Sequence, residues 1–99
     1  MRKIKIIVEQ IGEELEGAET YAKYAAKLKD TDKDLAAVYR DLASAELSHV
    51  DKLHEQVVRA IATEKSKGTD VPAAMQAVWD WEHDKMVDRT ARIKMILGK

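Results

Sequence analysis

Apolar side chains recur at three- and four-residue spacing along almost the whole chain, and strand-type alternation is absent. Such a period places the apolar positions on one side of an α-helix. Two breaks interrupt the pattern, at residues 29–32 and 67–72. The sequence therefore predicts an all-α fold of three long helices, over about residues 3–29, 32–66 and 71–97. Short connections predict that these helices pack antiparallel.

The residue types in the two breaks suit helix ends. In the first break, Thr31 is expected to cap the second helix, with Asp34 three residues further on. In the second break, Gly68 suits the position after a helix C-terminus, Asp70 an N-cap and Pro72 a first turn.

Each predicted helix has one apolar stripe that is expected to face the core. In the first helix the stripe comprises Ile4, Ile7, Val8, Ile11, Leu15, Ala18, Ala22 and Ala25. In the second helix it comprises Leu35, Val38, Leu42, Glu46, His49, Leu53, Gln56 and Ala60. In the third helix it comprises Val71, Met75, Val78, Trp79, Glu82, Met86, Ile93 and Leu97.

Two ionisable residues lie in the middle of the second stripe. Glu46 and His49 follow Leu42 and precede Leu53. Burial of such groups is unfavourable unless they are paired or bound to a metal. Their i, i+3 spacing projects both side chains from one helix face, as in helical bundles that bind metal through Glu-x-x-His. The alternative is a polar pair in the core or at a helix–helix contact.

A carboxylate of the first helix is predicted to reach the same place. Glu14 lies at the edge of the first stripe, about as far before the first break as Glu46 and His49 lie after it. When the two helices fold back on each other, all three residues lie about 25 Å from the loop. Agreement in both face and height predicts that Glu14, Glu46 and His49 bind a metal ion.

Other residues of the first helix are weaker candidates. Glu13 and Glu16 point away from the stripe and are expected to be solvated, and Glu19 lies at its opposite edge. Tyr21 lies two turns beyond Glu14 on the same side. It is the candidate for a catalytic role beside the metal, and the alternative is an aromatic side chain at the helix contact.

These residues resemble the ferritin-like superfamily, and the rubrerythrin branch in particular. In that family Glu is followed by Tyr seven residues later on one helix, and the next helix contains Glu-x-x-His. Glu14 with Tyr21, and Glu46 with His49, have this spacing, and the resemblance covers about residues 4–60. It implies a di-iron carboxylate site, with Mn or Zn as other candidate metals, and an oxidoreductase of the ferroxidase type that oxidises Fe(II) or handles peroxide.

The chain has only half of the ligands that such a site needs. A complete site takes ligands from two helix pairs, whereas this chain offers one pair. In this respect it is similar to encapsulated ferritins, in which two-helix protomers build the site between subunits. The resemblance implies a ferritin-like half-bundle completed by dimerisation, in a homodimer or a higher homo-oligomer. Cysteine is absent, so the rubredoxin-like module of full rubrerythrins is missing.

The third helix offers one more candidate ligand, Glu82. Folding this helix back from Gly68 places Glu82 about 8–10 Å from the site and brings Arg89 level with it. This offset favours a structural ion pair, with Arg59 as the expected partner of Glu82. His83 flanks the stripe and is expected to be a surface or hydrogen-bonding group rather than a ligand.

The remaining histidine and the large apolar side chains have less specific roles. His54 is expected to be exposed on the far face of the second helix. Packing or subunit contact is expected of the tryptophans and of three methionines, namely Trp79, Trp81, Met75, Met86 and Met95.

Composition narrows the function classes. A chain of 99 residues with 45% hydrophobic and 35% charged residues suits one globular helical domain, residues 1–99. A net charge of −1 gives no basic excess for nucleic acid, and no apolar run is long enough for a membrane span. A cytoplasmic location is expected, since no signal-peptide core follows the N-terminus. The alternative function is a non-catalytic helical interaction module with a buried Glu–His network.

Overall fold

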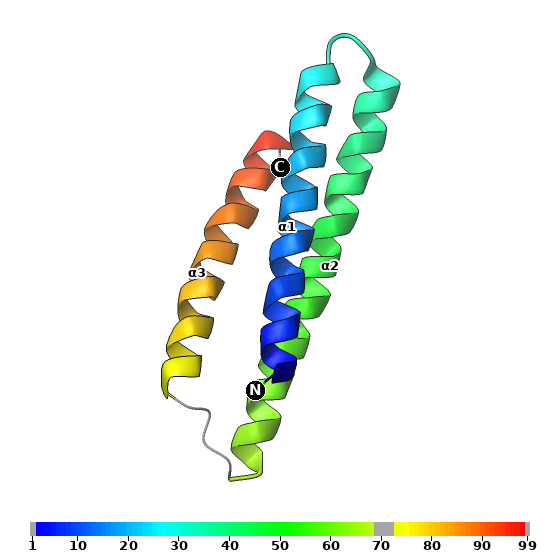
Figure 1. Ribbon diagram of the computed structural model, residues 1–99. Helices are drawn as coiled ribbons and strands as arrows, with labels where there is room; N and C mark the ends of the chain where they lie inside the picture. Colours follow the sequence, from blue (N-terminus) through cyan, green and yellow to red (C-terminus); the bar gives the residue numbers. More distant parts are fainter. Residues whose placement is uncertain (1, 69–72, 99) are drawn as a thin grey trace.

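A computed structural model of the chain describes residues 2–68 and 73–98 and contains three α-helices (Figure 1). They are α1 (Arg2–Leu28), α2 (Lys33–Ser66) and α3 (Ala73–Ile96). No strand occurs in these described residues, so the prediction of an all-α fold is confirmed. The expected helix start at residue 71 and the roles of Asp70 and Pro72 lie outside the described residues.

The three helices form a narrow rod in which consecutive helices are antiparallel (Figure 1). α1 and α2 form a long hairpin, and α3 lies mainly against α1. The rod measures 57 × 19 × 18 Å, and its width is that of about two helices. Among the described residues, no helix is long and apolar enough to cross a membrane. α3 ends well before the loop end of the hairpin, so that end has no third helix against it (Figure 1).

Small side chains form the contact between α1 and α2 near the loop. Ala18, Ala22 and Ala25 of α1 are buried, as are Ala36 and Ala43 of α2. Short side chains let two helix axes approach closely. Larger apolar residues fill the part of the core that α3 joins, and they include Ile4, Ile11, Leu15, Leu47, Val50, Val57, Trp79, Ile93 and Leu97.

The buried stripe of α2 differs from the predicted one, although that of α1 is confirmed. The buried residues are Ala36, Ala43, Leu47, Val50, Val57 and Ala60. Leu35, Val38 and Leu42 are instead 40%, 51% and 40% exposed. α2 thus has two neighbouring apolar stripes. The stripe with the alanines faces α1, because it packs closest against the alanines of that helix.

A tight turn connects α1 to α2. The amides of Thr31 and Asp32 donate to the carbonyl of Leu28 at 3.2 and 2.9 Å. The cap of α2 is Asp32 rather than the predicted Thr31, since the Asp32 carboxylate accepts a hydrogen bond from the Leu35 amide at 3.1 Å. At the other end of α2, Gly68 has a φ of +75°, as expected for the residue after a helix C-terminus.

Candidate metal centre

The turn between α1 and α2 sets a register in which Glu14 lies opposite His49, and Gly17 opposite Glu46. The Nδ1 atom of His49 is 3.4 Å from Oε2 of Glu14. One ligand atom from each of Glu14, Glu46 and His49 lies within 4.8 Å of the other two. The structure therefore brings together the three side chains that the sequence placed at one height.

The separation of these atoms suits a shared metal ion. Two ligand atoms with bonds of about 2.1 Å to one ion lie about 3.0 Å apart at a right angle and about 3.4 Å apart at the tetrahedral angle. The 3.4 Å between Glu14 and His49 falls in this range. The remaining separations are at most 4.8 Å, and the side chains must rotate for all three atoms to reach one ion. Two carboxylates and one imidazole are also a donor set that iron, manganese and zinc accept.

Gly17 provides the space that Glu46 occupies. A Cβ atom at Gly17 would lie 3.5 Å from Oε2 of Glu46 and 3.8 Å from its Cδ. The carboxylate therefore packs against the α1 backbone at a position that has no side chain. A Cβ atom alone would make an ordinary contact there, whereas a long side chain at Gly17 would displace the carboxylate. The apolar pattern did not indicate this role, and the available signal is a glycine three residues after Glu14 on the same helix flank.

The site opens to solvent instead of being sealed in the core. The His49 side chain is 48% exposed, whereas that of Glu14 is 17% exposed. The second oxygen of Glu14, Oε1, accepts a hydrogen bond from Gln10 Nε2 at 3.0 Å, which leaves Oε2 towards His49. The prediction that Glu46 and His49 lie centrally in a buried stripe is wrong, because a different stripe of α2 faces α1.

The side of α2 that carries Glu46 and His49 also carries exposed apolar side chains nearer the loop. Leu35 and Leu42 precede His49 by whole multiples of seven residues, a spacing that returns to one helix side within about 20° per step. Both leucines are 40% exposed, and Val38 beside them is 51% exposed. We define the open face of the hairpin by its metal-ligand candidates and these residues, namely Glu14, Gly17, Leu35, Val38, Leu42, Glu46 and His49.

Tyr21 borders the open face in an aromatic cluster. Its ring stacks on Tyr39 of α2 with centroids 5.9 Å apart, and Tyr39 meets Tyr24 at 5.2 Å. Tyr21 lies about 10 Å beyond Glu14 along the helix axis. Tyr21 thus lies on the loop side of the three ligand candidates with its ring against Tyr39, and its catalytic role stays a prediction.

Glu82 lies away from this group. It lines a groove between α1 and α3, together with Gly12 and Trp79. Its carboxylate pairs with Lys85 at 3.6 Å, one turn further along α3. The expected ion pair with Arg59 is therefore wrong, because Lys85 on the same helix is the nearer cation.

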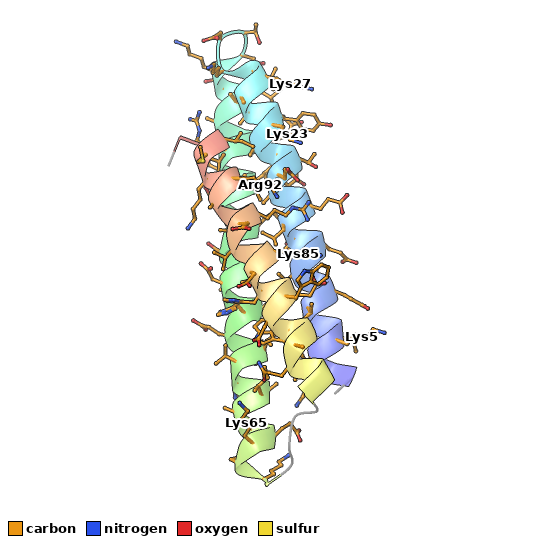
Figure 2. The ribbon with its side chains drawn as sticks, turned by 90° about the vertical axis from the view of Figure 1, so that its left-hand side faces the viewer. Lys5, Lys23, Lys27, Lys65, Lys85 and Arg92 are labelled. Atoms are coloured by element: carbon orange, nitrogen blue, oxygen red, sulfur yellow. The ribbon has the colours of Figure 1, made fainter. Side chains whose placement is uncertain are left out.

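Arg89, which the sequence placed level with the site, contacts α1 at Glu19. Its Nη2 donates to Oε2 of Glu19 at 3.0 Å, and Lys23 lies 3.6 Å from the other oxygen. The hydrogen bond from Arg89 lowers the pKa of Glu19 from 4.5, against the raising effect of burial, and the charges of Lys23 and Arg92 add to the lowering. Figure 2 shows the labelled Lys23 and Arg92 at neighbouring heights on α1 and α3. Glu19 thus links these two helices.

The other two histidines meet between α2 and α3, and the expectation that His54 is exposed on a far face is wrong. The rings of His54 and His83 have centroids 5.0 Å apart. The Trp79 ring lies 5.9 Å from His54 and 5.4 Å from His83. The sequence could not reveal this cluster, since it depends on how α3 is rotated against α2.

The tryptophans and methionines divide between core and surface. Trp79 is buried, and Met86 packs against the core, as expected. Trp81 is 60% exposed and Met95 77% exposed, so neither packs inside this chain. The Lys85 ammonium lies 3.7 Å from the Trp81 ring centre. The side chain of Met75 is not among the side chains that the structure describes.

No known protein family, curated protein or solved structure matches this chain. The ferritin-like resemblance rests on the spacing of Glu14, Tyr21, Glu46 and His49, and it stays a prediction. The structure adds the proximity of three of these residues, which is the basis of the function proposed below.

Proposed function

We propose that this protein is a ferritin-like iron-binding protein that oxidises Fe(II) at a site completed by a second copy of the chain. One observation carries the proposal. Glu14, Glu46 and His49 place ligand atoms within 4.8 Å of one another on an exposed side of the hairpin.

The donor set favours iron or a similar divalent ion. Carboxylate oxygens suit hard ions such as Mn²⁺, and imidazole nitrogen suits iron and zinc. Two ionised carboxylates offset the double positive charge of such an ion. The combination of two carboxylates, Glu14 and Glu46, with the imidazole of His49 therefore supports iron, with manganese and zinc as the other candidates.

A single chain leaves this site incomplete. Three ligand atoms fill about half of a six-coordinate shell. On the open face, Leu35, Val38 and Leu42 are also exposed. A two-fold axis across this face would set Glu14, Glu46 and His49 of one protomer against the same residues of its partner. The pair would supply the four-Glu, two-His ligand set of di-iron bundles and bury the apolar residues.

In the proposed reaction, Fe(II) as substrate gives up one electron to oxygen or peroxide. Glu14 and Glu46 provide negative charge that stabilises the more highly charged product ion. The hydrogen bond from Gln10 holds one oxygen of Glu14 and leaves the other free. The exposed His49 gives a soluble ion direct access in the separate protomer.

The rival function is an interaction module in which Glu14 and His49 form a polar contact that sets helix register. The 3.4 Å separation of these side chains is compatible with that role. The 48% exposure of His49 weighs against it, since water competes for an exposed polar contact.

Metal analysis of protein purified without a polyhistidine tag separates the two functions. We expect this site to hold about one metal per chain, or about two per dimer. Glu46→Ala and His49→Ala should each remove the metal held at this site. Glu13→Ala is the matched control, because Glu13 neighbours Glu14 and is exposed. Unchanged metal content in both site variants would refute the assignment.

Two further measurements test the shared site and the reaction. Light scattering at micromolar concentration should give a dimer or a larger assembly, and a monomer that holds two iron ions would contradict the shared site. Stopped-flow absorbance should show Fe(II) oxidation in air faster than in buffer. Glu14→Ala should slow it more than Glu82→Ala, because Glu82 lies in the groove against α3.

A further inference from the structure

Two histidines that the proposed iron site does not use converge across the contact between α2 and α3. His54 comes from α2 and His83 from α3, and both are partly buried. Their rings have centroids 5.0 Å apart and an interplanar angle of 30°. The chain has three histidines in all, so every histidine outside the iron site is in this pair.

We propose that His54 and His83 form a second metal site, for an imidazole-preferring divalent cation such as Zn²⁺. With metal–nitrogen bonds of about 2.0–2.1 Å, each ring centre lies about 3.2 Å from the ion. At the tetrahedral angle the two ring centres are then about 5.2 Å apart. The observed 5.0 Å is close to this value, so the separation of the two rings suits one shared ion.

The surroundings of the pair leave room for the rest of the shell. His54 and His83 line an open pocket together with Asp51, Thr90 and Lys94. Asp51 lies one turn before His54 on α2, and its charge favours a cation, whereas Lys94 opposes one. Among the described residues, three protein ligand atoms converge within 4.8 Å only at the proposed iron site. Two protein nitrogens and water therefore complete the zinc shell.

The second site has a different chemistry from the first and does not depend on it. Its two ligands are imidazoles, which zinc and copper accept readily, whereas the iron site is rich in carboxylates. The site would also link two helices that otherwise touch little, since α3 lies mainly against α1. A cation that binds only the docked arrangement stabilises it, by an amount that grows with the ratio of the free cation concentration to its dissociation constant.

Simple ring packing is the competing explanation. Aromatic pairs stack with centroids about 4.5–7 Å apart, and the contacts of Trp79 with His54 and His83 also fall in this range. Packing alone predicts no zinc affinity at the pair.

Calorimetric zinc titration of the full chain tests the proposal in a background that lacks the iron-site donors, E46Q/H49Q. We expect one saturable site per chain, and His54→Gln or His83→Gln should weaken it at least tenfold. Glu55→Gln is the matched control, because Glu55 is exposed and adjacent to His54. Equal affinity in the parent and both histidine variants would overturn the proposal.

Fluorescence gives an independent readout at the same place. The chain has two tryptophans, so Trp81→Phe leaves Trp79 as the only one. Cu²⁺ held by the pair should quench Trp79 strongly, because both imidazole rings lie within 5.9 Å of its ring. His83→Gln should remove this quenching, and quenching that persists in His83→Gln would contradict a site at the pair.

A measurement on the unmutated protein covers the case in which a variant fails to fold. Zn²⁺ should protect His54 and His83 from acylation by diethyl pyrocarbonate, as read by mass spectrometry of peptides. If zinc protects neither residue, ring packing is the whole explanation and the proposal is wrong.

Discussion

The two sides of the α1–α2 hairpin differ in what covers them. Towards α3, α1 presents Val8, Gly12 and Glu19, and we define these residues with their α3 partners as the α3 face. There Glu19 has Arg89 as its partner at 3.0 Å. On the open face, Glu14 pairs with the exposed His49 beside leucines that are 40% exposed.

This difference shows how one helix serves two kinds of contact. Glu14 and Glu19 are five residues apart, which is about 140° around the helix. Glu19 is satisfied by a cation from α3 within the chain. Glu14 belongs to a set of three candidate ligands on the open face, and in our proposal a second copy of the chain supplies the other three. We expect substitutions on the α3 face to change folding stability, and those on the open face to change association and metal binding.

The largest expected effect is in the part of the core that α3 joins. Ile93 is fully buried, so Ile93→Ala should lower the free energy of unfolding by about 2–5 kcal/mol. Leu42→Ala on the open face should cost much less in dilute protein, because Leu42 is 40% exposed. Urea unfolding at low protein concentration measures both. Equal losses would mean that the two faces do not differ in this way.

The open face offers a matched pair for the association test. Val38 and Val58 are both 51% exposed on α2, and their separation of 20 positions places them about 200° apart around the helix. Val38→Glu should weaken dimerisation at least tenfold, because it puts a charge on the proposed interface. Val58→Glu should leave the dimer intact. Analytical sedimentation measures the dimerisation of both variants. If Val58→Glu weakens the dimer and Val38→Glu does not, the interface lies on the other side of α2.

A smaller effect is expected at the two glycines of α1. Gly12→Ala should stabilise the fold by about 0.5–1 kcal/mol, because alanine is the better helix former and no atom lies within 4 Å of the added Cβ. Gly17→Ala should give a similar gain, since its Cβ makes an ordinary contact with Glu46.

Gly17→Leu should behave differently, because its longer side chain displaces the Glu46 carboxylate. We expect at least tenfold weaker metal binding with helix content unchanged by circular dichroism. Metal affinity equal to that of Gly17→Ala would show that the position of Glu46 against α1 is not needed for binding.

The smallest effect concerns the pH dependence of the α3 face. The pKa of Glu19 is lower in the folded protein than its ordinary value of 4.5, so its ion pair stabilises the fold above that pH. This contribution disappears as the pH falls through the lowered pKa. Glu19→Gln should therefore cost up to about 1 kcal/mol at pH 7 and nothing in acid below that pKa. Thermal unfolding at both pH values measures it, and a loss that persists in acid would contradict an electrostatic cause.

The helix bounds and the heights of residues along the helix axes were predictable from the sequence. The helix bounds follow from the apolar period and the breaks, and the turn at residues 29–32 sets which positions of α1 and α2 lie level. Because every helical residue rises about 1.5 Å, equal distances from the turn mean equal heights. That rule predicted that Glu14 lies at the same height as Glu46 and His49. The N-cap of α2 is Asp32 and not the predicted Thr31. Both residue types can cap a helix, and only the geometry of the turn selects between them.

Only the tertiary structure decided how each helix is rotated about its axis. On α2, the stripe with Leu35 and Leu42 and the stripe with Ala36 and Ala43 are both apolar. Packing against the alanines of α1 selects the smaller side chains, because they allow the closest approach. The same rotation leaves His49 exposed, and the seating of α3 brings His83 to His54. A sequence period gives the spacing of a stripe, whereas the fit of one surface against another decides which stripe is buried.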